Sequence, residues 1–287
     1  MNIVVNLNKD CGITSHDVVT ATKKVFKVKK AGHAGTLDPI ATGVLLVCLN
    51  EATKITGYLS ELDKEYIMTA KLGESTDTYD SEGKIIKTIP DFSVTQEEIE
   101  KVIKKFIGEI KQIPPMYSAI KVSGNSLYKL ARKGIEVERM PRKVIINSIE
   151  LLKFKSPFLV LKVSCSKGTY IRSLCNDIGN ALGIGAHIVE LVRTRIGDFT
   201  IENSAKINEL PHKTESLSSI DTALKHLPEV RLEGDNLKRA RHGNPVILNL
   251  LKDDVEGFIR LKDRDGKVFG IGKVLKDSIK IERLFNI

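Results

Sequence analysis

The chain has 287 residues, 41% of them hydrophobic, and its 45 Lys and Arg against 36 Asp and Glu give a formal net charge of +9. This length predicts a large domain, alone or with a small one, and the apolar content excludes a disordered or fibrous chain. The basic surplus favours a polyanionic partner.

Signals for export, membrane insertion and cofactor binding are all missing. No run of about 18 apolar residues and no basic-then-apolar leader occurs, so we expect neither a membrane span nor secretion. There is no P-loop and no G-x-G-x-x-G motif. No CxxC pair or metal-ligand spacing occurs among the cysteines, Cys11, Cys48, Cys165 and Cys175. We therefore expect a cytoplasmic chain with reduced thiols, no metal and no cofactor.

In the first half of the chain, hydrophobic periodicity predicts alternating helices and strands. The expected elements are a helix capped by Thr14 or Ser15 and ending in basic residues 23–30, a glycine-rich loop over 32–43, a buried strand over 44–49, a helix over 53–62, a strand from Tyr66, a polar turn-rich segment over 73–83, and a helix behind the capping box at Thr95.

The second half of the chain contains the predicted boundary between two domains. Its expected elements are a short basic helix over 127–133, strands over 144–154 and 158–165, a helix over 170–182, a connector over 203–227 with one short helix, and strands over 246–248, 257–261, 268–274 and 279–285. We divide the chain into a main domain over 1–228 and a small β-rich domain over 229–287. A domain of about 60 residues is marginal alone and gains stability by docking on a larger one.

The loop over 32–43 is the strongest candidate for a site. Glycine permits tight turns and close approach of a ligand, and Pro39 holds Asp38 in an extended backbone. An isolated Asp-Pro pair is most often an ordinary turn. This loop, however, contains three glycines and only two ionisable groups, His33 and Asp38.

Arg172 and two tyrosines add to this candidate. A cation in the first turn of a helix is disfavoured, so Arg172 is either solvated or paired with a distant carboxylate. Pairing with Asp38 would keep that carboxylate ionised and oriented, as a nucleophile requires. Tyr66 and Tyr170 are each core or rim aromatics when taken singly, but as a pair they could hold a nucleobase between them.

Several ordered motifs together resemble the TruB family of pseudouridine synthases, which isomerise uridine 55 in the T-loop of tRNA. The resemblance spans roughly residues 3–200, and a weaker similarity to a PUA-type RNA-binding domain covers the tail. Its motifs are Gly32-His33-Ala34-Gly35-Thr36-Leu37-Asp38-Pro39 with Ala41, Gly43 and Leu45, then Asp63-Lys64-Glu65-Tyr66, residues 114–119, Lys167-Gly168-Thr169-Tyr170-Ile171-Arg172, and Gly185-Ala186-His187 with Leu191 and Arg193. One departure is Asp10, which stands after Lys9 where the family usually has proline.

The resemblance implies an α+β fold, with a mixed, largely antiparallel central sheet flanked by helices and a small β-rich PUA-like C-terminal domain. It implies that Asp38 is the nucleophile, paired with Arg172, and that Tyr66 stacks on the target base. The remaining residues that it assigns to substrate binding are His33, Tyr170, Leu191, Lys9 and Lys64. The implied partner is the T stem-loop of tRNA, bound by a monomer without membrane or guide RNA.

Some alternatives stay open at this point. Asp38 could attack the sugar C1′ or the base C6, or act through a glycal, and Tyr66 is a candidate general base. A protein that only helps tRNA to fold is the alternative from another class. A single catalytic carboxylate argues against a hydrolytic glycosidase, which usually uses two. We also expect basic residues 23–30 and 129–143 to contact phosphates, with steep salt dependence of binding.

Overall fold

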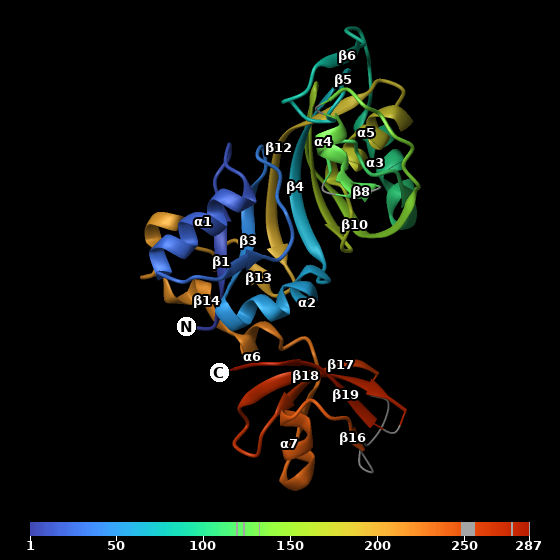
Figure 1. The fold of residues 1–287 in the computed structure, drawn as a ribbon. Coiled ribbons are helices and arrows are strands. Elements are labelled where there is room, and N and C mark those ends of the chain that lie inside the picture. The colour runs from blue at the N-terminus through green and yellow to red at the C-terminus, as the bar shows by residue number, and fades with distance from the viewer. Residues whose placement is uncertain (119, 123, 132, 248–255, 277, 287) are drawn as a thin grey trace.

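The structure, a computed structural model, describes residues 1–118, 120–122, 124–131, 133–247, 256–276 and 278–286. These residues form a large domain on a ten-stranded sheet and a small C-terminal domain on a five-stranded sheet. Figure 1 shows the small domain below the large one, with both chain termini near the junction.

The large sheet has the order β14-β1-β3-β12-β4-β11-β10-β7, with β2 paired to β3 and β13 paired to β12. Of these pairings, β3 with β12 is parallel and the others are antiparallel. The predicted mixed, largely antiparallel sheet is therefore confirmed. Its strands are β1 (Ile3–Lys9), β2 (Ala31–His33), β3 (Thr42–Leu49), β4 (Lys64–Leu72), β7 (Gly108–Gln112), β10 (Arg142–Lys155), β11 (Phe158–Cys165), β12 (Ala186–Ile196), β13 (Phe199–Thr200) and β14 (Leu217–Ser219).

Strand β12 lies at the centre of this sheet, yet the sequence analysis predicted no strand there. Its register against β4 shifts between Ile188 and Glu190 and again between Arg193 and Arg195. Each shift interrupts the alternation of buried and exposed positions by which a strand is recognised. Leu191 and Arg193, which lie between the two shifts, line the cavity described below.

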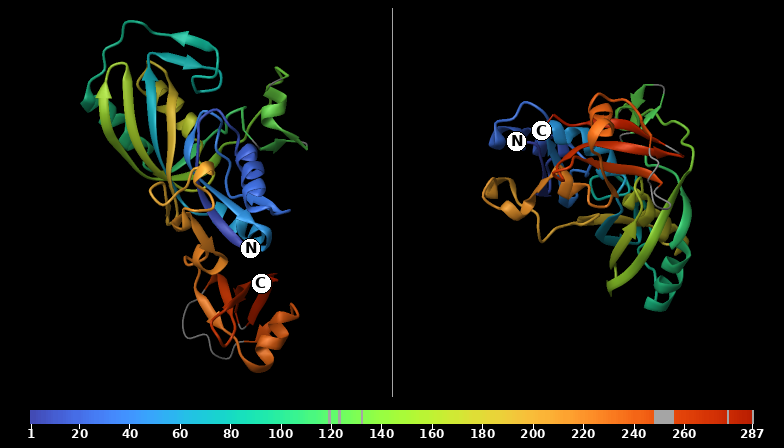
Figure 2. Two further views of the ribbon diagram at one scale, coloured as in Figure 1. Left: turned by 90° about the vertical axis from the view of Figure 1, so that its left-hand side faces the viewer. Right: turned by 90° about the horizontal axis from the view of Figure 1, so that it is seen from below.

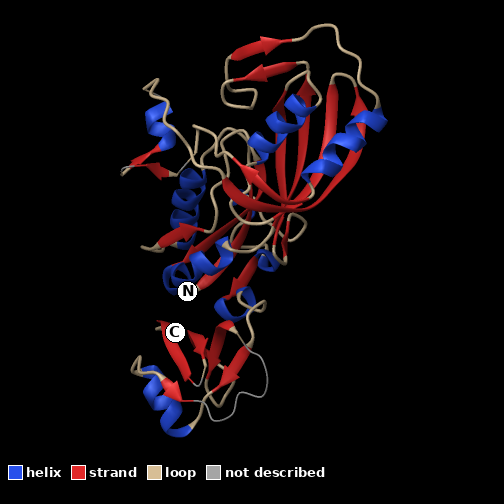
Figure 3. Cartoon of the chain, turned by 90° about the vertical axis from the view of Figure 1, so that its right-hand side faces the viewer, coloured by secondary structure: helices blue, strands red, loops and turns tan. Residues whose placement is uncertain are grey.

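The capping box predicted at Thr95 is confirmed, and of the two residues predicted to cap the first helix, Thr14 does so in a capping box. Thr14 caps α1 together with Asp17, and Thr95 caps α3 together with Glu98. Figure 3 shows α3 and α5 lying across one face of the sheet. The helices of the large domain up to α5 are α1 (Ser15–Phe26), η1 (Asn50–Ile55), α2 (Thr56–Ser60), α3 (Gln96–Ile103), η2 (Lys104–Phe106), α4 (Leu127–Ala131) and α5 (Ile171–Ala181).

Two small hairpins and β7 were not predicted. One hairpin, β5 (Glu74–Thr76) with β6 (Ile85–Thr88), occupies part of the segment expected to be turns. The other is β8 (Lys121–Val122) with β9 (Asn125–Ser126). The predicted basic helix over 127–133 is the shorter α4. Residues 119 and 132, which belong to the 114–119 landmark and to the basic segments, lie outside the described residues.

The core of the large domain is divided between the two halves of the sheet. Strands β4, β10 and β11 pack against α3 and α5 around Met68, Leu161 and Leu174, while β1 and β3 pack against α1 around Leu7 and Leu45. The segment over 34–41 joins β2 to β3 beside β12, between these two packed halves. Such a junction leaves room for a pocket.

The C-terminal domain has the strand order β15-β17-β18-β19-β16 and fits a PUA-like fold. The sequence analysis found three of its five strands nearly whole but missed β15 and α7, and residue 248 of the predicted strand over 246–248 lies outside the described residues. The elements from the connector onward are η3 (Ile207–Glu209), η4 (Thr214–Ser216), α6 (Ile220–Ala223), β15 (Glu229–Arg231), α7 (Gly234–Arg241), β16 (Val246–Ile247), β17 (Gly257–Lys262), β18 (Val268–Leu275) and β19 (Ser278–Leu284).

Charged and aromatic contacts dock the small domain on the large one. Asp221 of α6 accepts Arg260 Nη1 at 2.6 Å and Lys262 Nζ at 2.8 Å through its two oxygens. The rings of Tyr58 and Phe258 meet edge to face, with centroids 5.0 Å apart. Figure 2 shows the two domains from two further sides. That the small domain gains stability from docking stays a prediction.

Candidate active site

Hydrogen bonds from residues near the N-terminus hold the loop that carries Asp38. The Ser15 hydroxyl, at the start of α1, donates to the Leu37 carbonyl at 3.0 Å and accepts from the Leu37 amide at 2.9 Å. The Gly12 amide donates to the Pro39 carbonyl at 2.9 Å. These bonds set the backbone on both sides of Asp38, so its carboxylate is presented from a rigid support.

Lys9 is part of that support and does not line the pocket. Its side chain is 1% exposed. Its ammonium donates to the carbonyls of Asp10, Ile13 and Pro39 at 2.9, 2.8 and 3.2 Å. Burial lowers the pKa of Lys9, and the carboxylates of Asp38 and Asp10 act in the opposite direction. All three ammonium donors already have acceptors within the protein.

Asp38 is paired with Arg172, as the sequence analysis anticipated. Arg172 Nε lies 2.9 Å from Asp38 Oδ2, and Arg172 Nη1 lies 3.4 Å from Asp80 Oδ2. The guanidinium also donates to the carbonyls of Thr78 at 3.1 Å and Tyr117 at 2.8 Å. The side chains of Arg172 and Asp80 are 6% and 4% exposed, and that of Asp38 is 36% exposed. Arg172 is therefore locked in place, and Asp38 stays open to a substrate.

The sequence analysis missed Asp80. Its Oδ1 accepts from the Thr78 hydroxyl at 2.5 Å and from the Glu82 amide at 3.1 Å. The turn before β6 therefore holds the Asp80 carboxylate through contacts that do not involve Arg172. Asp80 lies in the polar segment predicted as turns. A carboxylate in such a segment is ordinarily solvated, so no local pattern distinguishes this one.

Gln112 of β7 fixes the backbone of Tyr170. The Gln112 amide side chain donates to the Tyr170 carbonyl at 3.0 Å and accepts from the Tyr170 amide at 2.8 Å. Tyr170 is the N-cap residue of α5 and has no side-chain capping bond. This contact supplies a partner for a backbone amide at the helix start, and it was also not predicted.

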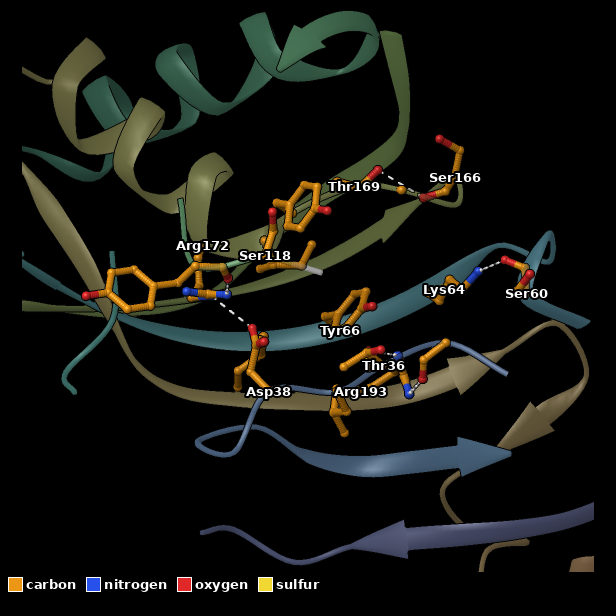
Figure 4. A pocket seen from close by; sticks show the side chains of 17 residues that line it. Thr36, Asp38, Ser60, Lys64, Tyr66, Ser118, Ser166, Thr169, Arg172 and Arg193 are labelled. Carbon is orange, nitrogen blue, oxygen red and sulfur yellow. Dashed lines mark hydrogen bonds and ion pairs between the residues drawn. The ribbon is translucent and has the colours of Figure 1, made fainter. Parts of the chain in front are cut away.

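A cavity of about 320 Å³ opens beside the Asp38–Arg172 pair. Pockets for small ligands typically occupy ~300–1,000 Å³. Figure 4 shows Tyr66, Lys64 and Arg193 gathered around it. Of the residues predicted to form the site, it brings together Asp38, Lys64, Tyr66, Tyr170, Arg172 and Leu191. A neighbouring hollow of about 460 Å³ shares Asp38 and Arg172 with it.

Burial controls the ionisation of the groups around this cavity. It raises the pKa of Tyr66, which Arg193 opposes, and it raises the pKa of Tyr170. Burial, followed by the charge of Arg193, lowers the pKa of Lys64 to about 8. The Lys64 ammonium donates to the carbonyls of Ser60 and Leu62, each at 2.5 Å.

His33 lies on β2 and does not line the cavity. Burial, followed by the charge of Arg193, lowers the pKa of His33, so its imidazole is neutral at pH 7. Its Nδ1 is buried and, among the described residues, has no hydrogen-bond partner. The structure therefore places His33 at the start of the loop of Asp38 and outside the lining of the cavity.

The described residues contain neither a metal-binding cluster nor a membrane-spanning helix. No group of three or more His, Cys, Asp and Glu side chains in that part of the chain is arranged to hold a metal ion. None of its helices is both long enough and apolar enough to span a bilayer.

Two solved structures share the fold of this chain. The first is titled "Structure of H/ACA RNP bound to a substrate RNA containing 2'-deoxyuridine", and the match has a TM-score of 0.77 at 26% identity, over 99% of this chain and 85% of that one. The second is a crystal structure of an archaeal box H/ACA sRNP complex, with a TM-score of 0.75 at 26% identity over 99% and 86% of the two chains. The family models that match the chain give its class, because all three describe domains of pseudouridine synthases.

Sequence comparison is more specific. Residues 23–171 match the "TruB family pseudouridylate synthase (N terminal domain)", 172–227 the "tRNA pseudouridylate synthase B C-terminal domain", and 228–285 "Pseudouridine synthase II TruB, C-terminal". Proteins named tRNA pseudouridine synthase B from Clostridium tetani and Vibrio atlanticus are 46% and 40% identical, over 99% and 97% of this chain and 99% and 92% of theirs. The chain belongs to the TruB family.

Proposed function

We propose that this chain isomerises uridine 55 in the T-loop of tRNA to pseudouridine, with Asp38 as the nucleophile. The observation that carries the assignment of Asp38 is its pairing with Arg172 at 2.9 Å, with Asp38 the more exposed partner, beside the cavity. A salt bridge favours the ionised carboxylate that a nucleophile requires.

The reaction breaks the bond between N1 and C1′, turns the uracil, and rejoins it through C5. The target base must first leave its stack, which costs a few kcal/mol. Aromatic stacking returns ~1–3 kcal/mol per base. Tyr66 and Tyr170 line the cavity and are the residues that we assign to hold the flipped uracil, with Leu191 as an apolar wall.

The remaining predicted contacts are assigned by position. Lys64 lines the cavity and we propose that it contacts the substrate, whereas Lys9 supports the loop of Asp38. We propose that His33 approaches the RNA beside the flipped nucleotide. The domain division that we propose, 1–228 and 229–287, is supported by β15, which begins at Glu229 and pairs with β17.

We propose that the enzyme acts as a monomer on the T stem-loop without a guide RNA. The full-length relatives named tRNA pseudouridine synthase B support a tRNA substrate. A tRNA substrate and the free thiols of Cys11, Cys48, Cys165 and Cys175 support a cytoplasmic location.

The test uses the purified chain and a tRNA transcript labelled with tritium at uracil C5. Forming the bond between C5 and C1′ expels the C5 hydrogen, so the isomerisation releases tritium to water. We expect release of about one equivalent from bare transcript, and none when the nucleotide at position 55 is changed. Tight binding without release would favour the tRNA-folding helper, and release only with an added guide RNA would overturn the stand-alone assignment.

A further inference from the structure

Arg193 occupies a junction of three strands beneath the cavity. In the antiparallel pairing of β12 with β4, Arg193 lies directly opposite Tyr66. In the parallel pairing of β12 with β3, the same residue lies opposite Gly43. The backbone approach at Gly43 is close, since an added Cβ would lie 2.2 Å from the Arg193 carbonyl oxygen. Arg193 therefore has a fixed place between the strand of Tyr66 and the strand that follows the Asp38 loop.

The Arg193 guanidinium binds the loop that carries Asp38. Nε donates to the Val44 carbonyl at 2.7 Å, Nη1 to the Thr36 carbonyl at 3.2 Å, and Nη2 to the Gly35 carbonyl at 3.2 Å. Figure 4 shows Arg193 bonded to this loop, with Tyr66 close by. The arginine thus joins the backbone near the nucleophile to the aromatic residue proposed to hold the base.

The charge of Arg193 has no counter-ion among the described residues. The residue is 1% exposed. Among the residues that the structure describes, its hydrogen-bond acceptors on the main chain are neutral carbonyls, and no carboxylate lies within salt-bridge distance. Burying a charge in this way is costly. We therefore expect the positive charge to do more than hold the loop.

The group beside this charge is the Tyr66 hydroxyl. The positive charge of Arg193 lowers the pKa of Tyr66, against the larger effect of burial, which raises it. The other groups that act on the phenol are Cys165 of β11 and the carboxylate of Asp38, which raise its pKa. Lys64 and Arg172 also line the cavity.

We propose that Arg193 is a positioning residue for this reaction, which holds Tyr66 in register with the Asp38 loop and stabilises negative charge on its hydroxyl. This inference rests on the proposed function. Once C5 is bonded to C1′, the C5 proton must leave while its electron pair stays in the ring as the C5–C6 double bond. A Tyr66 phenolate accepts that proton and becomes a phenol, and N1 takes up a proton from water.

The test compares Arg193→Gln, Arg193→Lys and the wild-type chain. Glutamine retains two N–H donors and removes the charge, whereas lysine retains the charge. Arg195→Met is the matched control, because Arg195 lies on the same strand and its side chain is 33% exposed. The readouts are tRNA affinity, the single-turnover rate of tritium release as a function of pH, and the ultraviolet titration of tyrosinate, with Tyr66→Phe subtracted to isolate Tyr66.

For Arg193→Gln we expect the single-turnover rate at pH 7 to fall about tenfold or more, with tRNA affinity changed less than about threefold. The ascending limb of the pH profile and the tyrosinate titration should both move to higher pH. Arg193→Lys and Arg195→Met should keep both near their wild-type positions. If Arg193→Gln does not fold, a displaced profile in Arg193→Lys would itself contradict the proposal.

Two results would overturn this inference: an unchanged rate in Arg193→Gln, or a lower rate with an unmoved pH profile and tyrosinate titration. The second would mean that Arg193 only holds the loop. Failure of the wild-type chain to release tritium would instead overturn the proposed function. The tyrosinate titration needs no turnover, so it tests the charge at Tyr66 in either case.

Discussion

Asp38 and Arg172 form an ion pair of 2.9 Å that connects the loop before β3 to the first turn of α5. The arginine is the buried partner, and it also reaches Asp80 from its other side. One cation therefore fixes the buried carboxylate of Asp80 and orients that of Asp38, the proposed nucleophile.

Asp38→Asn should abolish isomerisation and preserve tRNA binding. An amide is not a nucleophile, so the single-turnover rate should fall by roughly a thousandfold or more. Tritium release and filter binding measure the two properties separately, with the exposed Asp91→Asn as control. Loss of binding together with turnover would show that Asp38 has a structural role instead.

Arg172→Met should destabilise the fold as well as stop catalysis. It leaves the Asp80 carboxylate, 4% exposed, without its cation. Removing one partner of a buried pair costs about 3–5 kcal/mol. Urea unfolding of this variant beside Arg195→Met measures that difference. An equal free energy of unfolding in the two variants would mean that Asp80 is hydrated when Arg172 is absent.

Binding of tRNA should weaken steeply as salt increases. The chain carries a formal charge of +9, and each phosphate contact adds to the slope of log affinity against log salt by about −0.7 to −0.9. For several contacts we expect at least about a hundredfold loss between roughly 50 and 200 mM salt. An affinity that stays flat over this range would rule out the predicted phosphate contacts.

Lys64 should make stability depend on pH in the alkaline range. Its pKa in the folded chain is lowered from 10.5 to about 8. Between these values the unfolded chain binds more protons than the folded one, so the contribution of Lys64 to stability rises with pH and is least favourable below about 8.

Urea unfolding at several pH values tests this linkage. The free energy of unfolding of the wild-type chain relative to Lys64→Gln should rise by roughly 1–3 kcal/mol from about pH 7 to 10. Lys105→Gln, at an exposed lysine of η2, is the control. A difference that stays constant across this range would show that the Lys64 ammonium is as well solvated when folded as when unfolded.

Gly43→Ala should disrupt the site through the backbone. Gly43 has φ +100°, and a Cβ there would meet the Arg193 carbonyl oxygen at 2.2 Å. Strain and separation of β3 from β12 should cost about 3 kcal/mol or more. Gly32→Ala is the matched control in the same glycine-rich segment, since nothing lies within 4 Å of the place that its new methyl group would take. Equal thermal stability of the two variants would contradict the close packing of these strands.

Much of the site follows from local sequence patterns. The glycine-rich loop, the proline after Asp38 and the cation in the first turn of a helix each depend on neighbouring residues. They identified the carboxylate, its arginine and two of the tyrosines that line the cavity. Asp80, Gln112 and the placement of Arg193 could not be found in this way, because each acts on residues remote in the chain.

The fold, too, has features that local sequence patterns predict and features that only long-range packing decides. The capped helices α1 and α3, the alternating strands β4 and β11, and the family could all be predicted from the sequence, because short-range periodicity and ordered motifs carry that information. The position of β12 between β3 and β4, with its two register shifts, became known only from the folded chain. Strand pairing at long range depends on which surfaces pack together, and that packing places Arg193 opposite Tyr66.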